Sequence, residues 1–179
     1  MYLNKEKITN EIQIADDYCI AYSQYVFMTQ DGIIKDYVPF SDNLYEKDAI
    51  VDILALSKPC DRQLRGYVFS RKLFYEVGGY SNDMCLYEDL DLLCRLALKS
   101  RFVYTGEIGE GYRLNTGGLS SVTVDKAKDT IQLIRNKYIK RLSLRQRIKY
   151  NYSVGNYVFI KKTVNLCRDI KRCFFDLFY

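Results

Sequence analysis

The sequence predicts an α/β fold, because stretches typical of strands alternate with stretches typical of helices. Residues 18–28 are rich in β-branched and aromatic side chains, which favour a strand. Residues 87–97 carry leucine and alanine at intervals of three and four, the spacing of an amphipathic helix. The 179 residues suffice for one domain with a substantial core, and 48% hydrophobic with 27% charged residues indicates a globular chain.

The first half of the chain predicts short elements in sequence. Residues 8–17 resemble the end of a helix, and the strand over 18–28 comes next. Asp31-Gly32 is a hairpin signal, because such a turn needs positive φ, and residues 33–38 return as a second strand. Residues 49–56 have the spacing of a short helix that ends near Pro59.

The following elements lead to the predicted helix over 87–97. Residues 64–69 are typical of a short strand, and Ser70 is a suitable N-cap for a helix over 71–77 that stops at Gly78-Gly79. Beyond residue 97, we expect a short strand over 102–104 and a glycine-rich loop over 106–121. From Asp125 the pattern becomes helical and basic; residues 154–160 fit either state, and residues 164–179 predict an amphipathic helix.

The absence of histidine excludes several kinds of chemistry. The chain has no Ser-His-Asp triad, no Cys-His pair and no imidazole base, so acid–base work falls to carboxylates and any metal needs oxygen ligands. The six cysteines include no C-x-x-C pair, and Cys85 and Cys94 are expected to be buried, reduced thiols. With neither a secretory signal nor an apolar run of about 18 residues, we expect a cytoplasmic protein.

Charge is divided unevenly along the chain. Residues 1–125 contain 13 Lys/Arg and 19 Asp/Glu, a balance of −6, whereas residues 126–179 contain 14 and three, a balance of +11. The basic stretch has three interpretations: a solvated helical face packed on the body, a face that docks on an anionic membrane on the inner side of the cell, or a nucleic-acid contact. No recognised nucleic-acid motif is present, so nucleic acid is not the expected partner.

The sharpest candidate site is the sequence Glu88-Asp89-Leu90-Asp91, which places three carboxylates in one helical turn. On a helix, Glu88 and Asp91 share one face and Asp89 projects to another. A carboxylate at a helix N-terminus is held ionised by the helix dipole, which suits a base that takes a proton from a hydroxyl. The alternative is that these residues only stabilise the helix.

This site lies in a segment that resembles the family 2 glycosyltransferases. The resemblance is carried by residues 65–80, RGYVFSRKLFYEVGGY, and residues 88–96, EDLDLLCRL, which match a strand with a glycine, a short helix, a GG turn and an ED-x-DL-x-x-R helix. Tyr22-Ser23 with Asp31-Gly32, and Tyr112-Arg113 with Ser120-Ser121, resemble the flanking segments, so the match covers about residues 15–121.

The resemblance implies a partial GT-A fold of the Rossmann-like type over residues 1–124, with a basic helical extension over 125–179. It implies transfer of a sugar from a nucleotide-diphosphate donor to a sugar or lipid-linked acceptor hydroxyl, with inversion, in surface polysaccharide or glycolipid synthesis. Asp89 matches the family's catalytic base and Glu88 its partner that positions the acceptor. Gly66, Gly78 and Gly79 match positions where backbone passes close to the acceptor. Arg113 faces the donor diphosphate or, equally, is a plain arginine at the core edge, and Arg95 is expected to pair with the acidic turn of its own helix.

The chain departs from the family pattern in ways that change the expected activity. The family's nucleotide-binding first half and its D-x-D motif for Mg²⁺ or Mn²⁺ have no counterpart. The acidic pair Asp16-Asp17 lies beside the strand that normally follows that motif, so it is not expected to be the metal site. Leu114-Asn115 stands where many members have a metal-binding histidine. Asn136 replaces the tryptophan of the Q-x-x-R-W motif, so a processive synthase is not expected. We expect the chain alone to be inactive or nearly so, with a second chain supplying the donor half. The alternatives are a non-catalytic remnant or accessory subunit, and a peripheral membrane-binding protein.

Overall fold

The computed structural model describes residues 5–37, 48–56, 66–84, 86–113 and 124–155. The chain divides into two compact units, residues 1–141 and 142–179. The first unit contains α1 (Lys5–Ile14), β1 (Cys19–Met28), β2 (Ile34–Tyr37), α2 (Ala49–Leu56), β3 (Tyr67–Val68), α3 (Arg71–Glu76), α4 (Glu88–Ala97), β4 (Arg101–Arg113) and α5 (Val124–Ile139). The second unit contains a helix over residues 144–155. The mixed α/β class predicted from the sequence is confirmed, and α5 belongs to the first unit.

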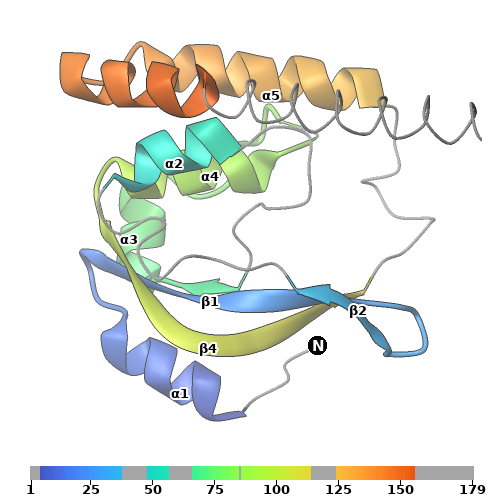
Figure 1. The fold of residues 1–179 in the computed structure, drawn as a ribbon. Coiled ribbons are helices and arrows are strands. Elements are labelled where there is room, and N and C mark those ends of the chain that lie inside the picture. The colour runs from blue at the N-terminus through green and yellow to red at the C-terminus, as the bar shows by residue number, and fades with distance from the viewer. Residues whose placement is uncertain (1–4, 38–47, 57–65, 85, 114–123, 156–179) are drawn as a thin grey trace, which may run out of the picture. The chain divides into compact units, whose positions relative to one another are not determined.

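A four-stranded mixed sheet is built around β1. On one side β1 pairs in parallel with β4 along its whole length, and on the other it pairs antiparallel with β3 near Ala21 and with β2 near Val26. Most of β1 is buried, as expected for a central strand covered on both faces. Figure 1 shows α1 on one face of this sheet and α3 and α4 on the other, with α2 and α5 farther out on that second side.

Local signals in the sequence correctly predicted several boundaries. The β1–β2 turn closes with a hydrogen bond from Thr29 N to Ile33 O (2.8 Å), and Gly32 takes the positive φ of +87° that this turn needs. Ser70 caps α3, because its Oγ accepts from Leu73 N at 3.0 Å. After α3, Gly79 N donates to Phe74 O and Gly78 N to Tyr75 O, which is a Schellman motif with both glycines at positive φ.

The expected glycine-rich loop after residue 104 is wrong over residues 106–113, because β4 continues to Arg113. The glycines accommodate irregular pairing instead of ending the strand. Tyr104 pairs with Tyr22 but Ile108 pairs with Gln24, so β4 bulges around Gly106, which has φ +77°. The rest of that predicted loop, and the predicted helix over 164–179, lie outside the described residues, as do Cys85 and residues 156–160 of the ambiguous stretch.

α1 packs on β4 through a buried ionic cluster. The Nζ of Lys7 lies 3.1 Å from Glu110 Oε1 and 3.4 Å from Glu11 Oε2, and the side chains of Lys7 and Glu11 are both inaccessible to solvent. Gly109 allows this arrangement, because a Cβ there would lie 2.1 Å from Lys7 Cδ. The stem of Lys7 therefore crosses β4 where the strand has no side chain.

The apolar core lies between the sheet and the helices on its second side. Buried side chains come from β1, α2, α4 and α5, among them Tyr22, Leu54, Leu92 and Ile134. Cys94 is a buried free thiol, as predicted. Among the described residues, no helix is both long and apolar enough to cross a bilayer.

Candidate functional site

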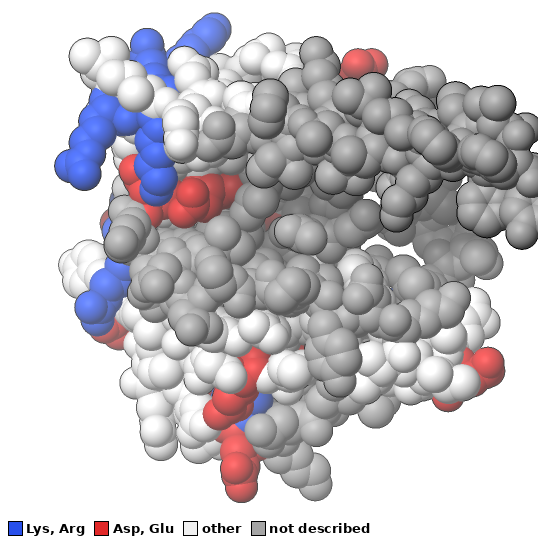
Figure 2. All heavy atoms as spheres, in the orientation of Figure 1, with Lys and Arg blue, Asp and Glu red and all other residues white. Residues whose placement is uncertain are grey.

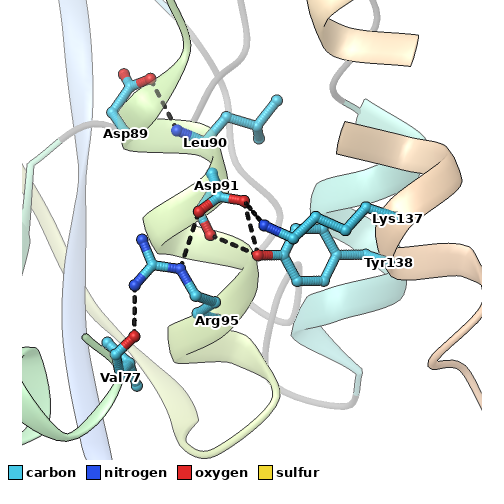
Figure 3. A network of polar contacts seen from close by, with 7 residues as sticks. All are labelled: Val77, Asp89, Leu90, Asp91, Arg95, Lys137 and Tyr138. Atoms are coloured by element: carbon cyan, nitrogen blue, oxygen red, sulfur yellow. Dashed lines mark hydrogen bonds and ion pairs between the residues drawn. The ribbon is translucent and has the colours of Figure 1, made fainter. Parts of the chain in front are cut away.

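In the first turn of α4, both oxygens of the Asp91 carboxylate accept hydrogen bonds from other side chains. Asp91 is 1% exposed, and its Oδ2 accepts from Arg95 Nε at 2.9 Å. Its Oδ1 accepts from Lys137 Nζ at 2.7 Å and from the Tyr138 hydroxyl at 2.8 Å (Figure 3). Asp91 therefore joins α4 to α5, although the two partners on α5 are far from it in the sequence.

Arg95 extends this network to the end of α3. Its Nε contacts Asp91, as predicted for an arginine that pairs with the acidic turn of its own helix, and its Nη1 donates to Val77 O. Val77 directly precedes the Gly78-Gly79 turn, so this hydrogen bond holds the turn against α4. Two of the glycines predicted to belong to the site are thus fixed to the helix that carries Asp89.

Opposing effects set the ionisation of the network. Burial alone raises the pKa of Asp91, but hydrogen bonds from Lys137, Tyr138 and Arg95 outweigh it and hold the pKa below the ordinary value of an aspartate. Burial and the hydrogen bond to Asp91 raise the pKa of Tyr138 well above that of a free tyrosine. Asp91 is therefore an ionised acceptor that a neutral phenol and two cations surround.

Asp89 lies in a different environment from Asp91. Its side chain is exposed, and Oδ1 accepts from Leu90 N at 2.8 Å. Figure 3 shows Asp89 pointing away from α5 and from the Asp91 network. Glu88, one residue earlier, is half-buried. The prediction that Asp89 projects to a different side of the helix from Asp91 is confirmed.

The start of α4 has an unusual backbone conformation that the sequence does not predict. Tyr87 occupies the N-cap in the left-handed region, at φ +60° and ψ 27°, and makes no side-chain capping bond. A bulky residue rarely adopts this conformation. The three carboxylates of the first turn lie at the end where the helix dipole favours negative charge, and so stabilise a helix that lacks a side-chain cap.

The structure places Gly66 and Arg113 on the sheet. Gly66 has φ +59°, its carbonyl accepts from Ser23 N at 3.2 Å, and a Cβ there would lie 3.0–3.3 Å from the Glu110 carboxyl group. Arg113 is the last residue of β4, opposite Met28, with an exposed side chain. Of the predicted site residues, Glu88 and Asp89 lie in the first turn of α4, whereas the hydrogen bond from Arg95 holds the Gly78-Gly79 turn against a later turn of the same helix.

A groove of about 490 Å³ opens on the α5 side of α4. It is formed by the loop before α4 and by one side of α5, with the lining residues Asp83, Met84, Leu86, Asp129, Thr130, Leu133, Ile134 and Lys137. Asp89 is not among them, so the groove and the exposed carboxylate are separate features.

The described residues do not fit a divalent cation near β1. Asp16 Oδ1 accepts from Tyr18 N at 2.7 Å, and Asp17 accepts from Lys72 Nζ at 2.6 Å and from Ser70 Oγ at 3.0 Å. Lys72 and Ser70 hold the pKa of Asp17 below its usual value. Across the described part of the chain, no three carboxylate or cysteine side chains gather as metal ligands would. Asn115 lies outside the described residues.

Sequence reasoning missed the residues that hold α4 in place. Lys137 and Tyr138 lie in the basic stretch, for which a helical face packed on the body was one of three interpretations. Ile131, Ile134 and Tyr138 are buried at helical spacing and form the inner face of α5. That apolar periodicity is a signal for burial. Nothing in the sequence indicates that Tyr138 and Lys137 meet Asp91.

Comparison with known proteins adds no relative to this picture. No protein-family model, curated protein or solved structure matches the chain. The exposed Asp89, the adjoining Glu88 and the anchored Gly78-Gly79 turn are therefore the features from which a function is inferred.

Proposed function

We propose that this chain supplies the acceptor-side part of an inverting glycosyltransferase of the family 2, GT-A type, with Asp89 as its catalytic base. The observation that carries the proposal is the contrast between two carboxylates in one helical turn. Asp91 is buried and bound by Arg95, Lys137 and Tyr138, whereas Asp89 is exposed and points away from them. One carboxylate anchors the helix, and the other is accessible to a substrate.

The order of the motifs along the fold adds support. A glycine before β3, the capped helix α3, the Gly78-Gly79 turn and the acidic start of α4 follow one another as in the resembling family. The hydrogen bond between Arg95 and Val77 O joins the last two of these features. Asp89 therefore lies on a helix that contacts α3 and α5 and not on a loop, so its carboxylate is held in a fixed position for an acceptor.

The proposed chemistry is a single displacement. The Asp89 carboxylate takes the proton of the acceptor hydroxyl while that oxygen attacks the anomeric carbon of the donor sugar. The bond from that carbon to the nucleoside diphosphate breaks, and the diphosphate leaves with the electron pair, which inverts the anomeric configuration. Glu88 positions the acceptor hydroxyl toward Asp89.

The donor side is proposed to come from elsewhere. Family members use a divalent cation against the charge of the leaving diphosphate, and the described residues of this chain do not fit one. We therefore assign the base to this chain and the binding of the donor to a second chain or segment. The product would be a surface polysaccharide or a glycolipid.

The test is complementation in cells from which the gene has been deleted. We expect the wild-type chain to restore the surface glycan and Asp89→Asn to restore less than about 1% of it, because removing a general base costs about 10²–10⁴-fold in rate. The readout is the sugar composition of the extracted polysaccharide and lipid fractions, with the amount of protein checked by immunoblot.

Asp31→Asn is the matched control. It makes the same chemical change in an exposed residue, and Asn-Gly keeps the turn between β1 and β2. We expect this variant to complement fully. Full complementation by Asp89→Asn would instead show a non-catalytic accessory role, and an unchanged glycan in the deletion strain would refute the assignment altogether.

A further inference from the structure

The helix over residues 144–155 exposes an apolar stripe. Leu144, Ile148 and Tyr152 are 76%, 63% and 71% exposed, and they recur every four residues, so they share one face. The helix has its own start signal, a capping box in which Ser143 N donates to Gln146 Oε1 at 2.9 Å and Ser143 Oγ accepts from Gln146 N at 3.3 Å. Large side chains exposed at this spacing are typical of a surface that meets a partner.

Basic side chains flank the stripe on both sides. At about 100° per residue, Arg145 and Lys149 lie to one side of it and Arg147 to the other. Between Asp129 and Asp169 the sequence has no carboxylate side chain at all. The basic residues in that interval are Arg135, Lys137, Lys140, Arg141, Arg145, Arg147, Lys149, Lys161, Lys162 and Arg168. Figure 2 shows basic side chains, in blue, gathered at the upper left of the view.

An apolar stripe flanked by basic side chains fits an anionic membrane better than it fits a nucleic acid. A polyanion such as RNA is bound by cations and aromatic rings, and it gains nothing from exposed leucine and isoleucine. A bilayer with anionic headgroups uses both features, because aliphatic side chains enter the acyl boundary while lysine and arginine contact the headgroups. Tyrosine at the end of the stripe is a side chain that favours the interface itself.

We propose that the helix over 144–155 docks the protein in the plane of an anionic membrane, with Leu144, Ile148 and Tyr152 inserted and the flanking basic residues on the headgroups. Membrane binding uses both kinds of side chain. The basic residues attract the helix to the anionic surface, and burial of the apolar side chains retains it there. The inference stands independently of the proposed transferase activity.

The absence of tryptophan from the chain allows a sharp test. In Tyr152→Trp the indole is the sole tryptophan, and we expect its emission to shift to the blue on phosphatidylcholine vesicles containing phosphatidylglycerol, with quenching by brominated acyl chains. Tyr18→Trp is the matched control, because Tyr18 is 69% exposed but lies before β1. Its emission is expected to stay unchanged. If the emission of Tyr152→Trp is neither shifted nor quenched by these vesicles, the proposal is overturned.

Sedimentation with vesicles separates the two parts of the contact. We expect Leu144→Ser/Ile148→Ser to lower the partition coefficient about tenfold or more, and Ile12→Ser, an equally exposed isoleucine on α1, to leave it unchanged. Arg145→Gln/Lys149→Gln should weaken binding mainly at low salt. If the serine variant binds as wild type, or single-stranded RNA displaces the vesicles, the surface is a polyanion site and the proposal is wrong. Asp89→Asn should bind vesicles as wild type does.

Discussion

At the scale of single residues, position within one helical turn separates two chemically identical side chains. Asp89 and Asp91 both belong to the acidic start of α4, yet the second is buried among three donors and the first is exposed. A buried carboxylate is tolerated only where its oxygens are bonded, and Asp91 meets this condition. Stability and the proposed catalysis therefore depend on different members of the same motif.

Replacing Asp91 by asparagine should destabilise the protein. The variant keeps the size of the side chain but leaves Lys137 and Arg95 without their anion, so we expect a loss of about 2–3 kcal/mol in the free energy of unfolding. Urea denaturation followed by circular dichroism measures this loss. Asp89→Asn is the control, because its carboxylate is exposed and contributes at most about 1 kcal/mol through the helix dipole. Equal losses in the two variants would contradict the division of roles.

At the scale of elements, β4 shows how a glycine can serve a strand rather than end it. Gly106 permits a bulge, while Gly109 and Gly111 leave room for Lys7 and Met28, whose side chains lie where a Cβ would be. The sequence suggests a loop because glycine is rare inside strands and common in turns. Only the pairing with β1 and the packing of α1 give these glycines their role.

Filling the space at Gly109 should loosen α1. A Cβ would lie 2.1 Å from Lys7 Cδ, and Lys7 is held by Glu11 and Glu110, so its stem has little freedom to move aside. We expect Gly109→Ala to cost about 1–3 kcal/mol, with faster hydrogen exchange of the α1 amides. Gly155→Ala is the control, because nothing lies within 4 Å of a Cβ there. Unchanged exchange in α1 would show that Lys7 adapts without cost.

At the scale of the whole molecule, two buried carboxylates respond oppositely to pH. Hydrogen bonds lower the pKa of Asp91 despite its burial, so its contribution to stability is present above about pH 4 and is lost as pH falls through its folded pKa. Burial raises the pKa of Glu11, although Lys7 and Ser23 oppose it. Its contribution is full below about pH 4 and is lost as pH rises through its folded pKa.

The opposite pKa shifts of Asp91 and Glu11 predict how the stability of variants at these two residues changes with pH. As pH rises from about 4 to 7, Glu11→Gln should gain stability relative to wild type, because the wild type must ionise a buried carboxyl group. Asp91→Asn should lose the steep fall in stability that the wild type shows below about pH 4. Free energies of unfolding from urea titrations across this range measure both effects. If the free energies of unfolding of Glu11→Gln and wild type change in parallel with pH, burial does not raise the pKa of Glu11.

Over the whole chain, sequence signals that act between near neighbours predicted the structure well. The cap at Ser70, the turn at Gly32, the stop at Gly78-Gly79 and the pairing of Arg95 with its own helix depend on contacts a few residues apart. The length of β4 was missed, because it depends on a partner about 80 residues away. The α5 partners of Asp91 were missed for the same reason.

The sequence by itself determined the α/β class, the starts and stops of the short helices, and the acidic turn in which the candidate base lies. Its split charge also marked the basic segment. The tertiary structure decided which carboxylate is buried and which is exposed, because burial depends on what α5 brings to α4. It also decided that the stripe of Leu144, Ile148 and Tyr152 stays exposed. Local patterns encode the periodicity of an element, but only packing determines which face of that element is covered.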